Sequence, residues 1–272
     1  MKFKIIFIVF NVIIVVSFLF IFLIPFFMLG WDYSRVFWAE NWAAAVIFVA
    51  VLAGLNGYFA WNWKLFTLLE REDWYGLIDY IEDSVYTRKR IGKQHLRVLI
   101  NTYVITSQPE KITRLEQFLR ENRPRLVPRF ALHLGIPHLL RNEPEDMKSY
   151  YAEMRDDPKC ADRDWIDWSY AFSLMLNQES ENAKEVLVDL QRRTKNDVLA
   201  LLTLYLLDAF TVGDNRINNM VVERKKGFQS RYTLEQWNRE VEKHRGNLQV
   251  IVLSKLVRDA SNWVFSDGTR AA

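Results

Sequence analysis

Two long apolar stretches lie within the first 63 residues. Residues 5–29 read IIFIVFNVIIVVSFLFIFLIPFFML, and residues 43–61 read AAAVIFVAVLAGLNGYFAW. As helices they would be about 37 Å and about 28 Å long, which is enough to cross the hydrocarbon core of a bilayer. Aromatic residues flank both stretches, as interfacial anchors do in membrane proteins. The pattern predicts a transmembrane hairpin over residues 1–63, with spans at 5–29 and 43–61 joined by a loop at 30–42.

A cleaved signal peptide is the alternative for the first stretch. It would share the basic start at Met1–Lys4, but its apolar core would be shorter and small residues would mark a cleavage site. No such site follows Leu29, so we expect a retained helix.

Polar and small residues inside the two stretches indicate how they pack. Asn11 and Asn56 are expected to form a hydrogen bond within the hairpin. Small side chains also recur one turn apart, which lets another helix approach closely, and the first stretch is the expected neighbour. These small residues are Ala50, Ala53, Gly54 and Gly57.

Basic residues near the ends of the hairpin predict its orientation. Lys2, Lys4, Lys64 and Arg71 lie on one side, and only Arg35 lies on the other. The positive-inside rule then places both termini in the cytoplasm, with the hairpin in an inner or plasma membrane.

Beyond residue 64, apolar residues recur at helical spacing between short polar breaks. Ser107-Gln-Pro-Glu110 and Asn142-Glu-Pro-Glu145 both match a capping box with proline in the first turn, and they lie about 35 residues apart. Ser107 and Asn142 are therefore predicted N-caps. Each first helix is expected to have a partner helix, and the partners are predicted at residues 94–106, 126–140, 165–176 and 198–210. The last is apolar nearly all round and should be the most buried.

The remaining segments complete an all-α domain plan. We expect helical repeats over 64–211, a linker and C-terminal capping helices over 212–265, and a disordered tail at 266–272. Residues 212–231 are either a weak helix or a basic linker. Thr233-Leu-Glu-Gln236 is a further capping box, and residues 248–265 form the last predicted helix.

A period of about 35 residues made of two helices resembles the tetratricopeptide-repeat family and its degenerate helical-repeat relatives. The resemblance covers residues 72–210, where Trp74 and Leu77 stand at the family's Trp-x-x-Leu spacing. Ile78, however, stands where that family prefers a small residue. The resemblance implies an α-solenoid whose concave face binds peptides or other proteins without chemistry of its own.

In such stacks the first helix of each pair lines the groove. The resemblance therefore implies partner contacts by exposed polar and aromatic residues of the first helices, with packing as the alternative for the tyrosine and solvation for the others. The candidates are Asp79, Arg114, Gln117, Tyr151 and Lys184.

Residues that carry chemistry are sparse. His133 and His138 are five apart with Pro137 between them, so they do not form a metal-binding pair of the i, i+4 kind. Cys160 is the single cysteine, which suits a reducing compartment, and nearby aspartates make it a poor nucleophile. The acidic residues around it lack calcium-loop spacing and are explained by capping and solvation. We expect no enzyme activity, metal, cofactor or small-molecule substrate.

The densest charged run, residues 88–97, has two interpretations. It is either a solvated loop between helices or a contact with anionic lipid, since each basic residue near such a surface contributes about 1 kcal/mol. The candidate lipid contacts are Arg88, Lys89, Arg90, Lys93 and Arg97. The chain as a whole carries 36 basic and 33 acidic residues, a near balance that argues against a nucleic-acid partner.

These patterns favour a membrane-anchored cytoplasmic helical-repeat scaffold that docks partner proteins in a membrane-associated complex. The alternative is a regulatory or accessory subunit of an integral membrane enzyme or transporter. That alternative would place ionisable residues inside the spans, and none lies in residues 5–29 or 43–61.

Overall fold

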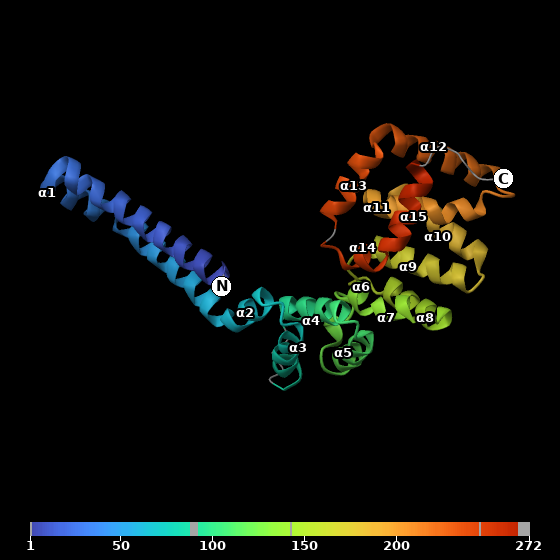
Figure 1. Cartoon of the computed structure of the whole chain (residues 1–272), viewed down its shortest axis with the longest axis horizontal. Helices are drawn as coiled ribbons and strands as arrows, with labels where there is room; N and C mark the ends of the chain where they lie inside the picture. The colour runs from blue at the N-terminus through green and yellow to red at the C-terminus, as the bar shows by residue number, and fades with distance from the viewer. Residues whose placement is uncertain (1, 88–91, 142, 245, 266–272) are drawn as a thin grey trace. The chain divides into compact units, whose positions relative to one another are not determined.

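The computed structural model describes residues 2–87, 92–141, 143–244 and 246–265 (Figure 1). All regular structure in these ranges is helical, as predicted. The chain divides into two compact units, Met1–Thr102 and Tyr103–Ala272. The boundary lies within a helix, whereas the predicted domain boundaries at 63 and 211 stay predictions. The predicted disordered tail, 266–272, lies outside the described residues.

The first unit begins with a helical hairpin, α1, over Lys2–Trp61. Its helical geometry is broken at Gly30, where φ is 83° and ψ is −179°. Glycine reaches positive φ without the steric cost of a side chain, so one residue separates the two arms. The arms Ile5–Met28 and Gly30–Trp61 are each long and apolar enough to cross a membrane. The predicted loop at 30–42 is therefore wrong, because its aromatic residues stand on the first turns of the second arm.

The arms pack through bulky side chains and one polar pair. Phe18 stacks on Phe48 with ring centroids 4.2 Å apart, and Asn56 Nδ2 donates to Asn11 Oδ1 at 2.7 Å. The predicted asparagine hydrogen bond is thus confirmed. The predicted packing of the small residues is wrong, because Gly54 and Gly57 are exposed and a Cβ added at either would meet nothing within 4 Å. The packed face of the second arm instead carries larger residues at helical spacing, among them Phe48, Asn56 and Phe59.

Short helices complete the first unit. They are α2 (Trp63–Glu70), α3 (Trp74–Glu82), a π-helical turn at Asp83–Thr87, and α4 (Lys93–Ile105). Asp73 caps α3 by accepting a hydrogen bond from the amide of Gly76. The Nζ of Lys64 lies 4.9 Å from the ring centre of Tyr80, which ties α2 to α3.

The second unit is built from α5 to α15. The helices are α5 (Pro109–Asn122), α6 (Ala131–Leu134), α7 (Ile136–Leu140), α8 (Pro144–Asp156), α9 (Arg163–Leu176), α10 (Ser180–Arg193), α11 (Asp197–Leu207), α12 (Asn215–Arg231), α13 (Leu234–Lys243), α14 (Leu248–Val252) and α15 (Ser254–Phe265). Short 3-10 turns lie at Pro124–Leu126 and Asp208–Phe210.

Helix starts recur with a period close to that predicted. Helices α3, α5, α8, α10 and α12 begin at residues 74, 109, 144, 180 and 215. Residues 212–231, predicted as a weak helix or a linker, therefore contain the fifth helix of this series. Asp214 caps it by accepting hydrogen bonds from the amides of Arg216 and Ile217.

The turns before three of these helices share one conformation. Glu72, Ser107 and Gln178 have φ of 54°, 55° and 63°, and the amide that follows each one donates to a carbonyl five residues back. Such left-handed residues close the preceding helix. Ser107 is therefore not an N-cap, because it ends α4, and the N-cap position of α5 is Gln108. Asn142 lies outside the described residues, and Glu143 takes the N-cap position of α8.

Two predicted helices are interrupted. The predicted helix 126–140 is split into α6 and α7 around Gly135, where a Cβ would lie 2.5 Å from Tyr151 Oη. Only glycine allows α8 to come this close, and Tyr151 Oη donates to the Gly135 carbonyl at 3.2 Å. The predicted helix 248–265 is split at Leu253 into α14 and α15.

Helix α11 forms the centre of the second unit. Nine of its 11 residues are buried, in agreement with the prediction, and it packs against α9, α10, α12 and α15 (Figure 1). Further along, Gln249 Nε2 on α14 donates to the Leu132 carbonyl on α6 at 2.7 Å. The C-terminal helices therefore return to the start of the unit, whereas repeats of an open solenoid contact only their neighbours.

Candidate functional site

The predicted partner-binding residues occupy different environments. Asp79 on α3 is exposed, and so are Arg114 and Gln117 on α5. Tyr151 is fully buried and hydrogen-bonded to Gly135, so packing explains it and it does not line a surface. Lys184 is half-buried, and its Nζ lies 3.8 Å from an Asp214 carboxylate oxygen. Of the four candidates in the second unit, only Arg114 and Gln117 are exposed.

Ion pairs join successive first helices of the second unit. Arg120 on α5 binds Glu153 on α8 with both guanidinium nitrogens, at 2.6 and 2.9 Å. Lys148 on α8 pairs with Glu179 at the start of α10, and Lys184 pairs in the same way with Asp214, one period later. These ion pairs link neighbouring helices, so their charges are not available to a partner.

Glu116 is the most buried acid of this network. Burial acts to raise the pKa of its carboxyl, but contacts with His138 and a hydrogen bond from Arg120 outweigh it and hold that pKa below its ordinary value. His138 stacks on Tyr150 with ring centroids 4.5 Å apart. These contacts give His138 a structural role between α5 and α8.

The acidic residues near Cys160 have partners that the sequence did not reveal. Asp167 on α9 accepts from Arg155 Nε at 2.7 Å and pairs with Arg193, which also binds Asp164 at 2.7 Å. Three helices are therefore joined by charges that capping and solvation do not explain. Burial, followed by the negative charge of Asp157, raises the pKa of the Cys160 thiol to about 11, and the protonated thiol is a weak nucleophile.

Only part of the predicted lipid-binding run can be placed. Arg88, Lys89 and Arg90 lie outside the described residues. Lys93 and Arg97 are exposed, one turn apart at the start of α4. Two neighbouring cations thus share one exposed strip of this helix.

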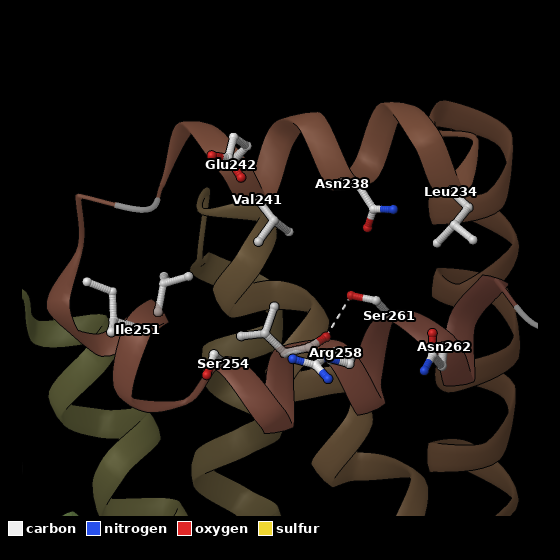
Figure 2. A pocket seen from close by; sticks show the side chains of 11 residues that line it. Leu234, Asn238, Val241, Glu242, Ile251, Ser254, Arg258, Ser261 and Asn262 are labelled. Carbon is white, nitrogen blue, oxygen red and sulfur yellow. Dashed lines mark hydrogen bonds between the residues drawn. The ribbon is translucent and has the colours of Figure 1, made fainter.

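A cleft with a volume of about 660 Å³ lies between α13 and the α14–α15 segment (Figure 2). Leu234, Asn238 and Val241 point from α13 toward α15, since they are four and three residues apart on one helical face. Ile251 lines the opposite side. Leu234 and Ile251 are 46% and 49% exposed, so large apolar side chains remain in contact with solvent at the cleft.

Trp237 positions α13 over α15. It is fully buried, and its Nε1 donates to Ser261 Oγ at 2.8 Å, which in turn donates to the Val257 carbonyl at 2.6 Å. The predicted capping box of α13 is confirmed, because Thr233 Oγ1 accepts from the Gln236 amide and Gln236 Oε1 accepts from the Thr233 amide. Both features fix the position of α13 and leave its face with Leu234, Asn238 and Val241 open to the cleft.

The cleft is suited to binding. Its polar lining consists of amide, hydroxyl, guanidinium and carboxylate groups at Asn238, Asn262, Ser254, Arg258 and Glu242. Within the residues that the structure describes, no group of three or more His, Cys, Asp and Glu side chains is placed to hold a metal ion. Leu234, Trp237 and Val241 recur at helical spacing. This spacing alone does not indicate that Trp237 is buried while the other two residues line a cleft.

Comparisons with known proteins identify relatives. A family model described as "Uncharacterised Treponema protein" matches residues 111–266, which contain the cleft. An "Uncharacterized protein" of Treponema pallidum (strain Nichols) is 24% identical over 234 residues, covering 81% of this chain and 74% of the relative. No solved structure matches the chain. No tetratricopeptide-repeat family model matches the chain, so that resemblance is not confirmed.

Proposed function

The chain belongs to the family described as "Uncharacterised Treponema protein", and we propose that it is a membrane-anchored scaffold that docks a partner protein. The observation that carries the proposal is the cleft between α13 and α15, where Leu234 and Ile251 are nearly half exposed. Exposed apolar groups beside polar ones are typical of a surface that another protein covers.

The hairpin is the proposed anchor. Its arms expose large apolar residues along their length, for example Ile6, Ile21 and Ile47, each more than 60% exposed. Exposing so much contiguous apolar surface to water is unfavourable, whereas the hydrocarbon core of a bilayer accommodates it. We place both termini in the cytoplasm, because Lys64 and Arg71 follow the second arm and Arg35 stands alone near Gly30.

The second unit is the proposed docking domain. Its four helix starts at 109, 144, 180 and 215, with a spacing of 35 or 36 residues, support a degenerate helical-repeat stack with α13 to α15 as its terminal element. The cleft lies between two neighbouring helices, so a helical or extended segment of a partner would fit along it and cover Leu234 and Ile251. The exposed residues Asp79, Arg114 and Gln117 remain candidates for additional contacts.

An accessory subunit of a membrane enzyme or transporter is the second candidate. Residues 5–28 and 41–57 contain no ionisable side chain, and the charged residues Asp32, Arg35 and Glu40 lie in the first third of the second arm. Substrate or proton paths through a membrane use such groups at depth. Their absence from these residues favours the scaffold.

Site-specific photo-cross-linking in the native membrane tests the proposal. A photoreactive phenylalanine analogue would replace Leu234 or Ile251, and Leu176 at the end of α9, an apolar residue 40% exposed, provides the control. We expect a cross-linked partner from both cleft positions and none from Leu176. The accessory subunit would instead be supported by cross-links from Val46 or Ile47 on α1 to another membrane protein, together with no cross-link from Leu234 or Ile251.

A further inference from the structure

A second concave surface lies between α10 and α12 and is lined by cations. Two adjoining hollows, of about 600 and about 410 Å³, share Gln191, Arg224 and Gly227 and so form one continuous groove. The basic groove is defined by Arg192, Lys195, Arg216 and Arg224, all of which are exposed.

The four cations of the basic groove have no acidic partner within 4 Å among the described residues. Arg120, Lys148, Lys184 and Arg193 in the same unit are all paired. Two acids line the groove, and one of them, Asp197, is already bound by Arg231 and by the Tyr232 hydroxyl. Glu223 is the other. Four unpaired cations against one uncommitted carboxylate leave the groove positive.

A buried polar group lies at the centre of the groove. Gln191 is 4% exposed, lines both hollows, and its amide oxygen has no hydrogen-bond partner. Buried polar atoms in native proteins are rarely left unsatisfied, which makes this side chain a candidate for contact with a bound ligand. Because the amide nitrogen and oxygen can exchange places, the side chain can offer a donor to an anion.

Gly227 also indicates that the groove is open to a ligand. It lies in the interior of α12, where glycine weakens a helix relative to alanine. Packing does not require it, because an added Cβ would meet nothing within 4 Å. Gly227 instead leaves the groove without a side chain at the point where the two hollows meet.

We propose that the basic groove binds an acidic segment of the docked partner, an inference that rests on the proposed scaffold function. Three of its cations are arginines, whose guanidinium groups bind carboxylates in a bidentate manner. Met220 and Phe228 add apolar contacts suited to a polypeptide. A concave groove does not match a flat lipid surface, and the net charge of only +3 is unlike that of a nucleic-acid binder.

Fluorescence anisotropy of the detergent-solubilised full chain tests this binding. The probe is a labelled twelve-residue peptide of glutamate, and the same peptide of glutamine is its neutral counterpart. We expect salt-sensitive binding of the glutamate peptide alone, weakened at least about 30-fold when Arg192, Arg216 and Arg224 are changed to Gln. Arg239→Gln on α13, which also removes one exposed arginine, should leave binding within about twofold.

Gly227 gives a test that leaves the charge unchanged. Gly227→Gln should fill the groove and weaken peptide binding about tenfold, whereas Gly227→Ala should retain it, with helicity by circular dichroism kept in both. Unchanged binding by the triple arginine variant or by Gly227→Gln would overturn the proposal. So would tighter, arginine-dependent binding of a twelve-nucleotide single strand or of anionic vesicles than of the glutamate peptide.

Cross-linking separates the failure of this inference from the failure of the scaffold. A photoreactive residue at Asn219, which lines the groove, should capture the same partner as one at Leu234. If Leu234 captures a partner while Asn219 does not and the peptide fails to bind, the acidic segment is overturned and the scaffold stands. If neither Leu234 nor Ile251 captures a protein, the scaffold itself is overturned.

Discussion

Asn56 Nδ2 donates to Asn11 Oδ1 at 2.7 Å, joining the two arms of α1 across 45 residues of sequence. Each amide also donates to a carbonyl of its own helix, Asn11 to Phe7 and Asn56 to Leu52, both at 2.9 Å. The hydrogen bond between the arms is made in addition to these bonds within each helix. It fixes the register of two arms whose other contacts are apolar. Phe7 against Phe59 and Phe18 against Phe48 follow the same register.

Removing that bond should loosen the hairpin. Asn56→Leu is expected to lower the free energy of hairpin unfolding in detergent by about 0.6 kcal/mol, the average for interhelical hydrogen bonds in membranes, and by no more than about 1.7 kcal/mol. Asn41→Leu is the matched control, because Asn41 makes a bond to the Phe37 carbonyl and none is seen across the arms. A double-mutant cycle with Asn11→Leu measures the coupling, and additive effects would show that the bond contributes nothing.

Replacing the turn residue Ser107 by glycine should increase the stability of the chain. Because its φ is 55°, Ser107→Gly should remove left-handed strain and stabilise the chain by up to about 1 kcal/mol. Ser230→Gly, within α12, should instead lower the stability.

Thr233→Ala should lower the free energy of unfolding by about 0.5–2 kcal/mol, because it removes the cap of α13. Thermal unfolding of the solubilised full chain measures all three, and a loss for Ser107→Gly would contradict its role in the turn.

Some of these features were predictable from sequence because they are local or periodic. The two apolar arms, the Thr233 capping box and the burial of α11 follow from spacing alone. Ser107 was misassigned because a serine three residues before a glutamate fits both an N-cap and the residue that closes the previous helix. Gly30 was missed because a glycine beside aromatic residues also fits a loop. A short window does not decide between these alternatives.

The surfaces could not be predicted because they depend on contacts between distant segments. The hydrogen bond from Gln249 to Leu132 joins residues 117 apart in sequence, and nothing in either segment indicates the other. The basic groove likewise combines α10 with α12, so Arg192 and Arg224 looked like ordinary solvated charges. Whether an exposed charge can bind a ligand becomes clear only when the fold shows which charges lack partners.

Glu116 should make stability depend on pH in the acidic range. The pKa of its carboxyl is lowered in the folded chain, so the unfolded state binds a proton first as pH falls. Its stabilisation is therefore present above the ordinary pKa of 4.5 and is lost as pH falls below that value. The melting temperature of the wild type should drop more steeply from pH 5 to pH 3 than that of Glu116→Gln. Glu121→Gln, at an exposed position, should follow the wild type, and parallel curves for all three would contradict the expectation.

The proposed topology predicts opposite labelling of two cysteines. In a Cys160→Ala background, Glu40→Cys should react with a membrane-impermeant maleimide added to intact cells, because the start of the second arm faces outward. Ser149→Cys, at an exposed position on α8 in the second unit, should react only after the cells are opened. Reaction of Ser149→Cys in intact cells would reverse the topology and place the docking domain outside.

The two described cations of α4 predict a lipid-dependent signal. Lys93 and Arg97 are exposed one turn apart, and Gln94 beside them is exposed as well. An environment-sensitive dye on Gln94→Cys, in a Cys160→Ala background, should shift to the blue in nanodiscs with anionic lipid compared with neutral lipid. Electrostatic attraction is screened by salt, so the shift should be lost at 1 M salt, where the Debye length is about 3 Å. Changing Lys93 and Arg97 to Gln should reduce it at low salt, since each basic residue near such a surface contributes about 1 kcal/mol. The same shift in neutral and anionic nanodiscs would leave solvation as the explanation for this charged run.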